Sequence, residues 1–105
     1  MFSTISPDVL SRPTARKDYQ LVDLRSPLEF RRSSLAGAMN IPYTKLPDSI
    51  DQLSTEKEIV LICNDGYMAG AARNFLKGYA KMQNVLALES GFTPLSKKLS
   101  AKKAG

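Results

Sequence analysis

Histidine is absent from this 105-residue chain, and cysteine occurs only once, as Cys63. Without histidine, the chain cannot build a Ser-His-Asp or Cys-His catalytic arrangement, an HExxH zinc site or a histidine-ligated haem. A single cysteine excludes an internal disulfide, a CxxC redox pair and a thiolate zinc cluster within one chain. We therefore expect no metal and no cofactor, and any cysteine chemistry depends on Cys63.

Long hydrophobic runs are also missing. The longest uninterrupted apolar segments, such as residues 59–63, are far shorter than the roughly 20 residues that a membrane span needs. The N-terminal sequence MFSTISPDVLSRP has no basic segment followed by an apolar one, so it does not resemble a secretory signal. We expect no membrane partner and a cytoplasmic location.

The composition, with 43% hydrophobic and 24% charged residues, is typical of one globular domain over residues 1–105. The net charge of +5 is unevenly distributed, because the last nine residues contain Lys97, Lys98, Lys102 and Lys103. The remainder is nearly neutral. No aromatic residue follows Phe92 to stack on a base, so we expect a frayed, basic C-terminal helix and tail at about 97–105 and no nucleic-acid partner.

The first part of the chain alternates helix and strand signals. Ser6, followed by proline and aspartate, predicts a short helix that stops near Pro13. Residues 20–24 are apolar and β-prone, which predicts a strand. Directly after it, Ser26 and Glu29 have the spacing of a capping box around a proline, so a helix should follow.

The same alternation continues. Residues 39–41 predict a second strand, and a helix should follow because hydrophobic residues recur at helical spacing at Leu46, Ile50 and Leu53. Residues 85–88 predict a further strand. Thr93 and Pro94 have the order of a cap and a first helical residue, which predicts a last helix to about residue 101.

The unbroken apolar run at 59–62 predicts a central strand that is buried on both faces. After a turn at 64–66, a helix should present one hydrophobic stripe made of Ala69, Ala72, Phe75, Leu76 and Tyr79. Alternating strands and helices indicate an α/β fold with a parallel sheet. Ligands bind beyond the carboxyl ends of such strands, which makes Cys63 the candidate site residue.

Two motifs in this order resemble the signatures of the rhodanese-like domain family. LVDLRSPLEF (21–30) and LAGAMNIPY (35–43) are similar to the first signature, and IVLICNDGYMAGAA (59–72) is similar to the second. ESGF (89–92) is similar to the glycine-bearing turn before the last helix of the family. The resemblance covers residues 5–99 and implies a three-layer α/β/α fold with a mainly parallel sheet of about five short strands.

The resemblance further implies a sulfurtransferase. Cys63 would take sulfane sulfur from a thiosulfate, persulfide or polysulfide donor and hold it as a persulfide. Because there is no second cysteine, the acceptor would be an external thiol or a sulfur-acceptor protein. The loop after Cys63 would surround the sulfur with backbone N–H groups and the positive end of a helix, and Gly66 permits the unusual φ that such a loop needs. This substrate-binding loop consists of Asn64, Asp65, Gly66, Tyr67, Met68 and Ala69.

The loop departs from the family pattern in ways that favour one class of donor. Many active members have an arginine followed by serine or threonine where this chain has Met68 and Ala69. Asp65 adds a negative charge, so we expect thiosulfate to be a poorer donor than persulfides or polysulfides. Tyr67 and Met68 are either walls of the site or incidental packing. The alternative is a weak or inactive module that acts as a protein-binding or sulfur-carrier domain.

Simpler roles remain for several of these residues. Cys63 is either a nucleophile or a buried, inert thiol. Asp23 and Arg25 are expected to give structural support as a charge pair after the strand, and Glu29 to complete a helix cap. The related phosphatase and arsenate-reductase chemistry uses a C-x5-R loop, which would need an arginine at position 69. Ala69 occupies that position, so the sequence argues against this chemistry.

Overall fold

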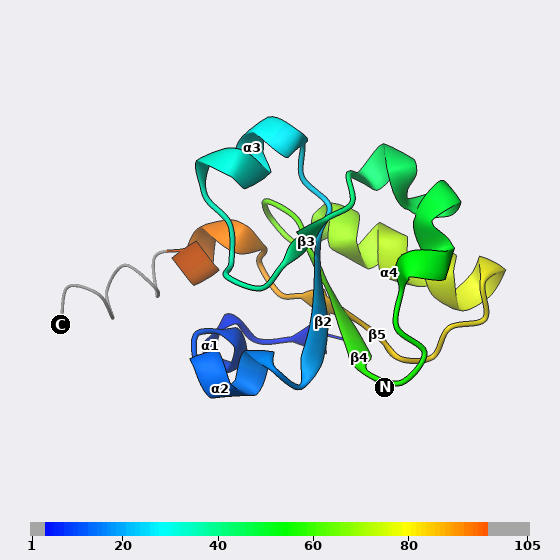
Figure 1. Ribbon diagram of the computed structural model, residues 1–105, viewed down its shortest axis with the longest axis horizontal. Coiled ribbons are helices and arrows are strands. Elements are labelled where there is room, and N and C mark those ends of the chain that lie inside the picture. Colours follow the sequence, from blue (N-terminus) through cyan, green and yellow to red (C-terminus); the bar gives the residue numbers. More distant parts are fainter. Residues whose placement is uncertain (1–3, 97–105) are drawn as a thin grey trace, which may run out of the picture.

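Five short parallel strands form the sheet at the centre of the computed structural model, which describes residues 4–96 (Figure 1). The strands are β1 (Thr4–Ile5), β2 (Tyr19–Asp23), β3 (Met39–Asn40), β4 (Glu58–Ile62) and β5 (Val85–Leu88). Their order in the sheet is β1-β5-β4-β2-β3, and every pairing is parallel. The predicted α/β class is confirmed, and β4 takes the predicted central position.

Helical segments connect the strands and cover both faces of the sheet (Figure 1). They are α1 (Pro7–Leu10), α2 (Pro13–Arg16), α3 (Pro27–Arg32), the 3₁₀ helix η1 (Tyr43–Gln52) and α4 (Tyr67–Tyr79). A further helical turn spans 92–96. The basic C-terminal tail that the sequence predicts at 97–105 lies outside the described residues.

The N-terminal segment differs from the expectation. The predicted single helix is two short helices, because α1 ends at Leu10 and Pro13 begins α2 instead of ending the first helix. Proline has no N–H to donate, so it fits the first position of a helix. Strand β1 is not predicted by the sequence, since two residues carry no periodic pattern. It is defined by its pairing with β5, in which Thr4 lies opposite Ala87.

The segment after β3 is a 3₁₀ helix, although the hydrophobic spacing predicts a helix of ordinary type. Pro47 lies inside it and removes a backbone donor, which is incompatible with a regular α-helix interior. The spacing still identifies the inward side correctly, because Leu46 and Leu53 are buried and Ile50 packs against the core.

Two further expectations about helices need correction. Tyr79, which the spacing places in the buried stripe of α4, is 73% exposed and stacks on Phe75 with ring centroids 5.2 Å apart. It lies on the flank of the stripe beside Phe75, which is only half-buried, whereas Ala69, Ala72 and Leu76 are buried. The last helical turn begins at Phe92, so Pro94 is its third residue and not its first.

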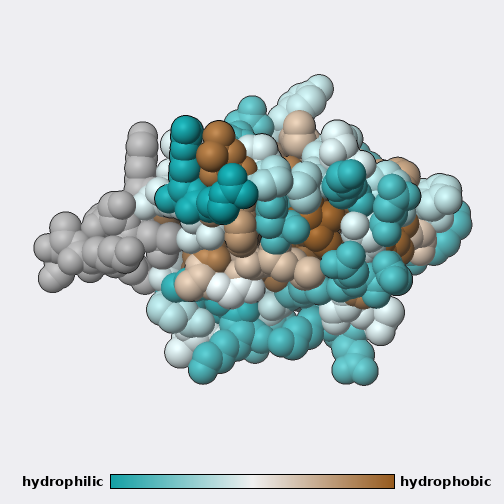
Figure 2. Space-filling view, turned by 45° about the horizontal axis from the view of Figure 1, so that its top comes forward, coloured by the Kyte–Doolittle hydropathy of each residue, from teal (hydrophilic) through white to brown (hydrophobic). Residues whose placement is uncertain are grey.

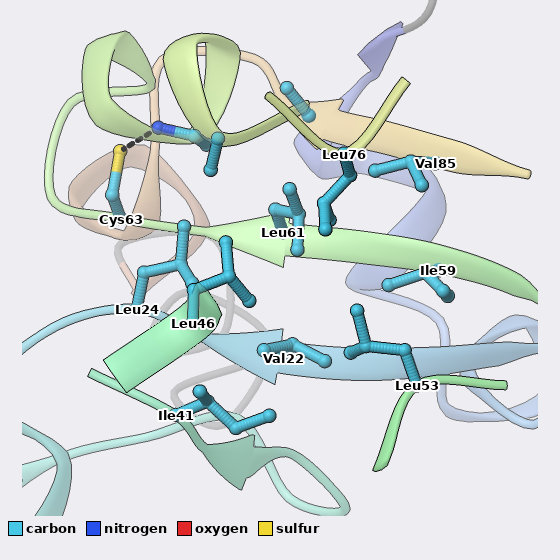
Figure 3. Close-up of a cluster of buried hydrophobic side chains, with 13 residues drawn as sticks. Val22, Leu24, Ile41, Leu46, Leu53, Ile59, Leu61, Cys63, Leu76 and Val85 are labelled. Carbon is cyan, nitrogen blue, oxygen red and sulfur yellow. Dashed lines mark hydrogen bonds between the residues drawn. The ribbon is translucent and has the colours of Figure 1, made fainter. Parts of the chain in front are cut away.

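The core consists of two hydrophobic clusters on opposite faces of the sheet. Along β4, Ile59 and Leu61 belong to the cluster beneath α4, whereas Val60 and Ile62 belong to the other cluster. This alternation follows from the two-residue period of a strand. Because both faces are covered, every position needs an apolar side chain, which explains the unbroken run. Cys63 lies at the edge of the first cluster (Figure 3).

The turn after β5 lies directly against the loop after β4. Gly91 has a φ of +75°, and a Cβ at this position would collide with the backbone of Asn64. Gly66 has a φ of +90°, and a Cβ there would be 3.0 Å from the backbone nitrogen of Ser90. Only glycine permits this close approach of two backbones. The geometry of the cysteine loop is therefore fixed from the neighbouring strand.

We expect Gly91→Ala to destabilise the fold far more than Gly37→Ala. Gly37 is a matched control, because its φ is +92° but a Cβ at this position would meet no atom within 4 Å. Gly37→Ala should cost only the left-handed strain of about 1–2 kcal/mol. Gly91→Ala must also displace the backbone of Asn64. Urea unfolding of both variants measures the difference, and equal losses would contradict the proposed backbone contact.

Candidate active site

Cys63 is the first residue after the central strand β4, so it lies at the carboxyl edge of the sheet. It is 2% exposed, and it lines a cleft of about 470 Å³. The cleft is formed by the connection from β2 to α3, the start of η1, the loop 63–65 and Met68 on the first turn of α4. A small ligand that enters the cleft can therefore reach the thiol.

Two backbone N–H groups donate to the sulfur of Cys63. The Gly66 nitrogen lies 3.1 Å from Sγ, and the Ala69 nitrogen lies 3.2 Å from it. The bond from Ala69 is drawn in Figure 3. The Tyr67 amide instead donates to Oδ1 of Asp65 over 3.0 Å. The segment 64–69 thus wraps around the sulfur as expected, with two amides in contact.

The charges around the sulfur have opposing effects. The two amides and the N-terminal end of α4 favour an anion at Sγ, such as a thiolate or a persulfide. Oδ1 of Asp65 lies 3.9 Å from Sγ, where the thiol can donate to it. An anion beside this carboxylate is disfavoured by repulsion. The site can therefore hold a sulfur anion on its backbone side while repelling a second anion on the side of Asp65.

Asp23 and Arg25 form a buried ion pair next to the cleft. Arg25 Nη2 lies 2.8 Å from Oδ2 of Asp23, and Arg25 Nε donates to both carboxylate oxygens. Nη2 also donates to the Ser33 carbonyl over 2.6 Å. The guanidinium carbon lies 4.0 Å above the ring of Phe92, whose backbone N–H donates to the carbonyl of Cys63 over 2.7 Å. The pair is therefore connected to the Cys63 backbone through Phe92.

Glu29 connects α3 to the cysteine loop. The predicted capping box with Ser26 is present, and the second carboxylate oxygen of Glu29 accepts a hydrogen bond from Nδ2 of Asn64 over 2.9 Å. The sequence pattern predicts only the cap for Glu29. The hydrogen bonds from the Asn64 side chain and then from the Ser26 backbone lower the pKa of Glu29 below its ordinary value of 4.5.

The predicted loop residues separate into two groups. Asn64, Asp65 and Met68 line the cleft, whereas Tyr67 does not and is 85% exposed. Tyr67 and Met68 are expected in the loop from the sequence, but both belong to the first turn of α4. The helix begins early because Gly66, in the left-handed region, turns the chain immediately.

Other cleft walls are not identified by the sequence. Leu24, Pro27, Pro42 and Tyr43 provide apolar surface in the same cleft as Met68. Their only signal is membership of the first motif, at 21–30 and 35–43, because the chain itself does not indicate that these segments meet the cysteine loop. The residues that surround a substrate are therefore set by the tertiary fold.

Residues 4–96 contain no group of three histidine, cysteine, aspartate or glutamate side chains that could hold a metal ion. Over the same residues, no helix combines the length and the apolar character required to cross a bilayer.

We predict that Glu29 contributes stability that is lost in acid. A carboxyl group whose pKa is lower in the folded state binds fewer protons there than in the unfolded state. Its contribution to the free energy of unfolding is therefore complete above its ordinary pKa. That contribution is lost as the pH falls through the folded-state pKa. The difference in free energy of unfolding between the native protein and Glu29→Gln should be larger at about pH 7 than at about pH 3. In an Asn64→Ala background this pH dependence should shrink. A difference that is independent of pH would show that the charge on Glu29 contributes nothing.

Comparisons with known proteins agree on one family. The model of the rhodanese-like domain matches residues 6–98. The chain is 34% identical over 86 residues to the uncharacterized protein YqhL of Bacillus subtilis, covering 80% of this chain and 66%, just under two thirds, of that protein. It is 28% identical over 94 residues to the thiosulfate sulfurtransferase GlpE of Shewanella oneidensis, covering 88% and 90%. A rhodanese-related protein from Thermoplasma volcanium superposes with a TM-score of 0.81 at 27% identity, covering 92% and 93%. The chain therefore belongs to the rhodanese-like domain family.

Proposed function

We propose that this protein is a sulfurtransferase in which Cys63 carries sulfane sulfur as a persulfide. The observation that carries the proposal is the placement of the only cysteine in a cleft of about 470 Å³, with two backbone amides on its sulfur. A relative that covers most of the chain is named a thiosulfate sulfurtransferase, which supports the same activity.

The reaction consists of two displacements at sulfur. In the first, the Cys63 thiolate attacks the outer sulfur of a donor R–S–SH. The S–S bond of the donor breaks, R–S⁻ leaves with the electron pair, and Cys63 becomes a persulfide. In the second, an external thiolate attacks the outer sulfur of that persulfide, and the Cys63 thiolate leaves. No net oxidation or reduction takes place, so no redox cofactor is required.

The Gly66 and Ala69 amides serve both displacements. Cys63 is an anionic nucleophile in the first and an anionic leaving group in the second, and both amides point at the atom that carries this charge. Hydrogen bonds to a charged group contribute about 1.5–3 kcal/mol each. Because these donors are backbone groups fixed by the start of α4, they need no reorganisation during the reaction.

Incubation with a sulfane donor should add one sulfur atom to Cys63. Mass spectrometry of the protein treated with thiosulfate or an alkyl persulfide detects the adduct, and cyanide should remove it. Cys63→Ser is the control and should remain unmodified while keeping the fold. The absence of an adduct with every sulfane donor would contradict the catalytic proposal.

A binding module without catalysis is the second candidate. It is favoured by Tyr67, which is 85% exposed beside the cleft without lining it, and by Met68, which is 43% exposed. One observation counts against the binding module. The face shown in Figure 2 is mostly hydrophilic with separate hydrophobic areas, whereas a typical docking surface has a single large apolar patch. If binding is the function, Cys63→Ser should leave partner binding and any cellular role unchanged.

The lining of the cleft disfavours thiosulfate as the donor. Among the described residues that line it, Arg25 is the only cation, and its guanidinium is already bound to Asp23 and Ser33. Met68 provides a polarisable thioether where a cationic side chain would bind the sulfonate-like oxygens of thiosulfate. A persulfide has no such oxygens, so the absence of a cation weakens its binding less than that of thiosulfate.

Met68→Arg should therefore raise kcat/KM for thiosulfate, by about tenfold to a hundredfold, because a guanidinium adds charge-assisted hydrogen bonds in the transition state. In the native protein, kcat/KM for persulfide or polysulfide donors should exceed that for thiosulfate. Tyr67→Arg adds the same charge one residue away, outside the cleft lining, and is the matched control. An equal gain in both variants would show that net charge, and not a cation in the cleft, raises activity with thiosulfate. No gain in Met68→Arg would show that the missing cation does not determine the donor.

A further inference from the structure

Two carboxylates line the cleft, and the one cation in its described lining, Arg25, is the last of the causes that lower the pKa of Glu29. Glu29 and Asp65 line it, and among residues 4–96 neither forms an ion pair. The one cation in the described lining, Arg25, is compensated by Asp23. Arg31 and Arg32 lie in the last turn of α3 and do not line the cleft. The described lining of the cleft therefore carries a net negative charge.

Both carboxylates are held in place by hydrogen bonds. Oδ1 of Asp65 accepts from the Tyr67 amide over 3.0 Å, which keeps it 3.9 Å from Sγ of Cys63. Glu29 accepts from Asn64 over 2.9 Å and from the Ser26 amide over 3.3 Å. These bonds favour the ionised form of Glu29, whose pKa is lowered. A ligand in the cleft thus meets the Asp65 carboxylate next to the thiol and the Glu29 carboxylate elsewhere in the lining.

The rest of the lining suits a small carbon chain. Leu24, Pro27, Pro42, Tyr43 and Met68 make most of the wall apolar. The volume of about 470 Å³ is within the range of small-molecule sites, about 300–1,000 Å³.

We propose that the cleft selects low-molecular-weight alkyl persulfides that carry an ammonium group near the sulfane sulfur. This inference rests on the proposed sulfurtransferase function. The Cys63 thiolate attacks the outer sulfur of H₃N⁺–R–S–SH, the donor S–S bond breaks, and H₃N⁺–R–S⁻ leaves with its ammonium unchanged. Asp65 and Glu29 attract the ammonium, while the Gly66 and Ala69 amides stabilise the sulfur anion.

Three donors of equal length test the selection: 2-aminoethyl, 2-hydroxyethyl and 2-carboxyethyl persulfide. Formation of the Cys63 persulfide is followed by mass spectrometry to give kcat/KM for each. An ammonium also makes the thiol a better leaving group, so each donor is compared between protein variants and not only with the other donors. The variants are the native protein, Asp65→Asn and Glu56→Gln. Glu56→Gln removes the same charge at the opposite end of β4.

Because Asp65 lies 3.9 Å from Sγ, Asp65→Asn can also change the Cys63 thiol itself, and the neutral hydroxyethyl donor measures that common effect. Relative to the hydroxyethyl donor, Asp65→Asn should lower kcat/KM for the aminoethyl donor by about fivefold, as expected for one charge pair a few ångströms apart, and should raise kcat/KM for the carboxyethyl donor. High salt should weaken the preference. Glu56→Gln should leave kcat/KM for all three donors as in the native protein.

The outcomes separate the selection from the function. If Asp65→Asn changes kcat/KM by the same factor for all three donors, Asp65 acts only on the Cys63 thiol, and the proposed selection is wrong. An equal effect of Glu56→Gln would overturn it as well, since the preference would then come from net charge. If no donor forms a persulfide on Cys63, the sulfurtransferase function fails and the selection fails with it.

Discussion

The hydrogen bond from the Phe92 amide to the Cys63 carbonyl, 2.7 Å long, joins the ends of two neighbouring strands, β4 and β5. Gly91 packs on the backbone of Asn64 at the same point. Because the two backbones touch, neither loop can move without the other. The position of the Cys63 sulfur, the start of α4 and the shape of the cleft all depend on this contact, and the ion pair of Arg25 stacks on Phe92 to support it.

Local patterns predict the parts of the fold that local chemistry determines. The apolar run of β4 indicates a strand covered on both faces, and Ser26 with Glu29 indicates a helix start, since each signal lies within a few residues. The prediction for Tyr79 is wrong because the helical period shows which side of a helix faces inward but not how wide the buried stripe is. The short strand β1 exists only through its pairing with β5, which no local pattern encodes.

The candidate site is predictable in part for the same reason. Cys63 can be nominated from its place after the central strand, and contact of the loop amides with its sulfur can be anticipated from the turn. The bond between Glu29 and Asn64 joins residues 35 positions apart, and the stacking of Arg25 on Phe92 joins segments farther apart still. Such contacts arise only when strands far apart in sequence become neighbours, so they cannot be inferred from spacing.

Backbone and side chains have separate tasks in this site. The donors to the Cys63 sulfur are the backbone amides of Gly66 and Ala69, whose positions follow from the turn and from the start of α4. The side chains of Asp65 and Met68 line the cleft, and neither donates to the sulfur. If Cys63 carries sulfur as we propose, substitutions at these two positions can change which donor enters while the stabilisation of the sulfur anion is retained. A negative cleft is then compatible with an anionic reaction centre, because the amides act at the sulfur and the carboxylates act on the rest of the donor.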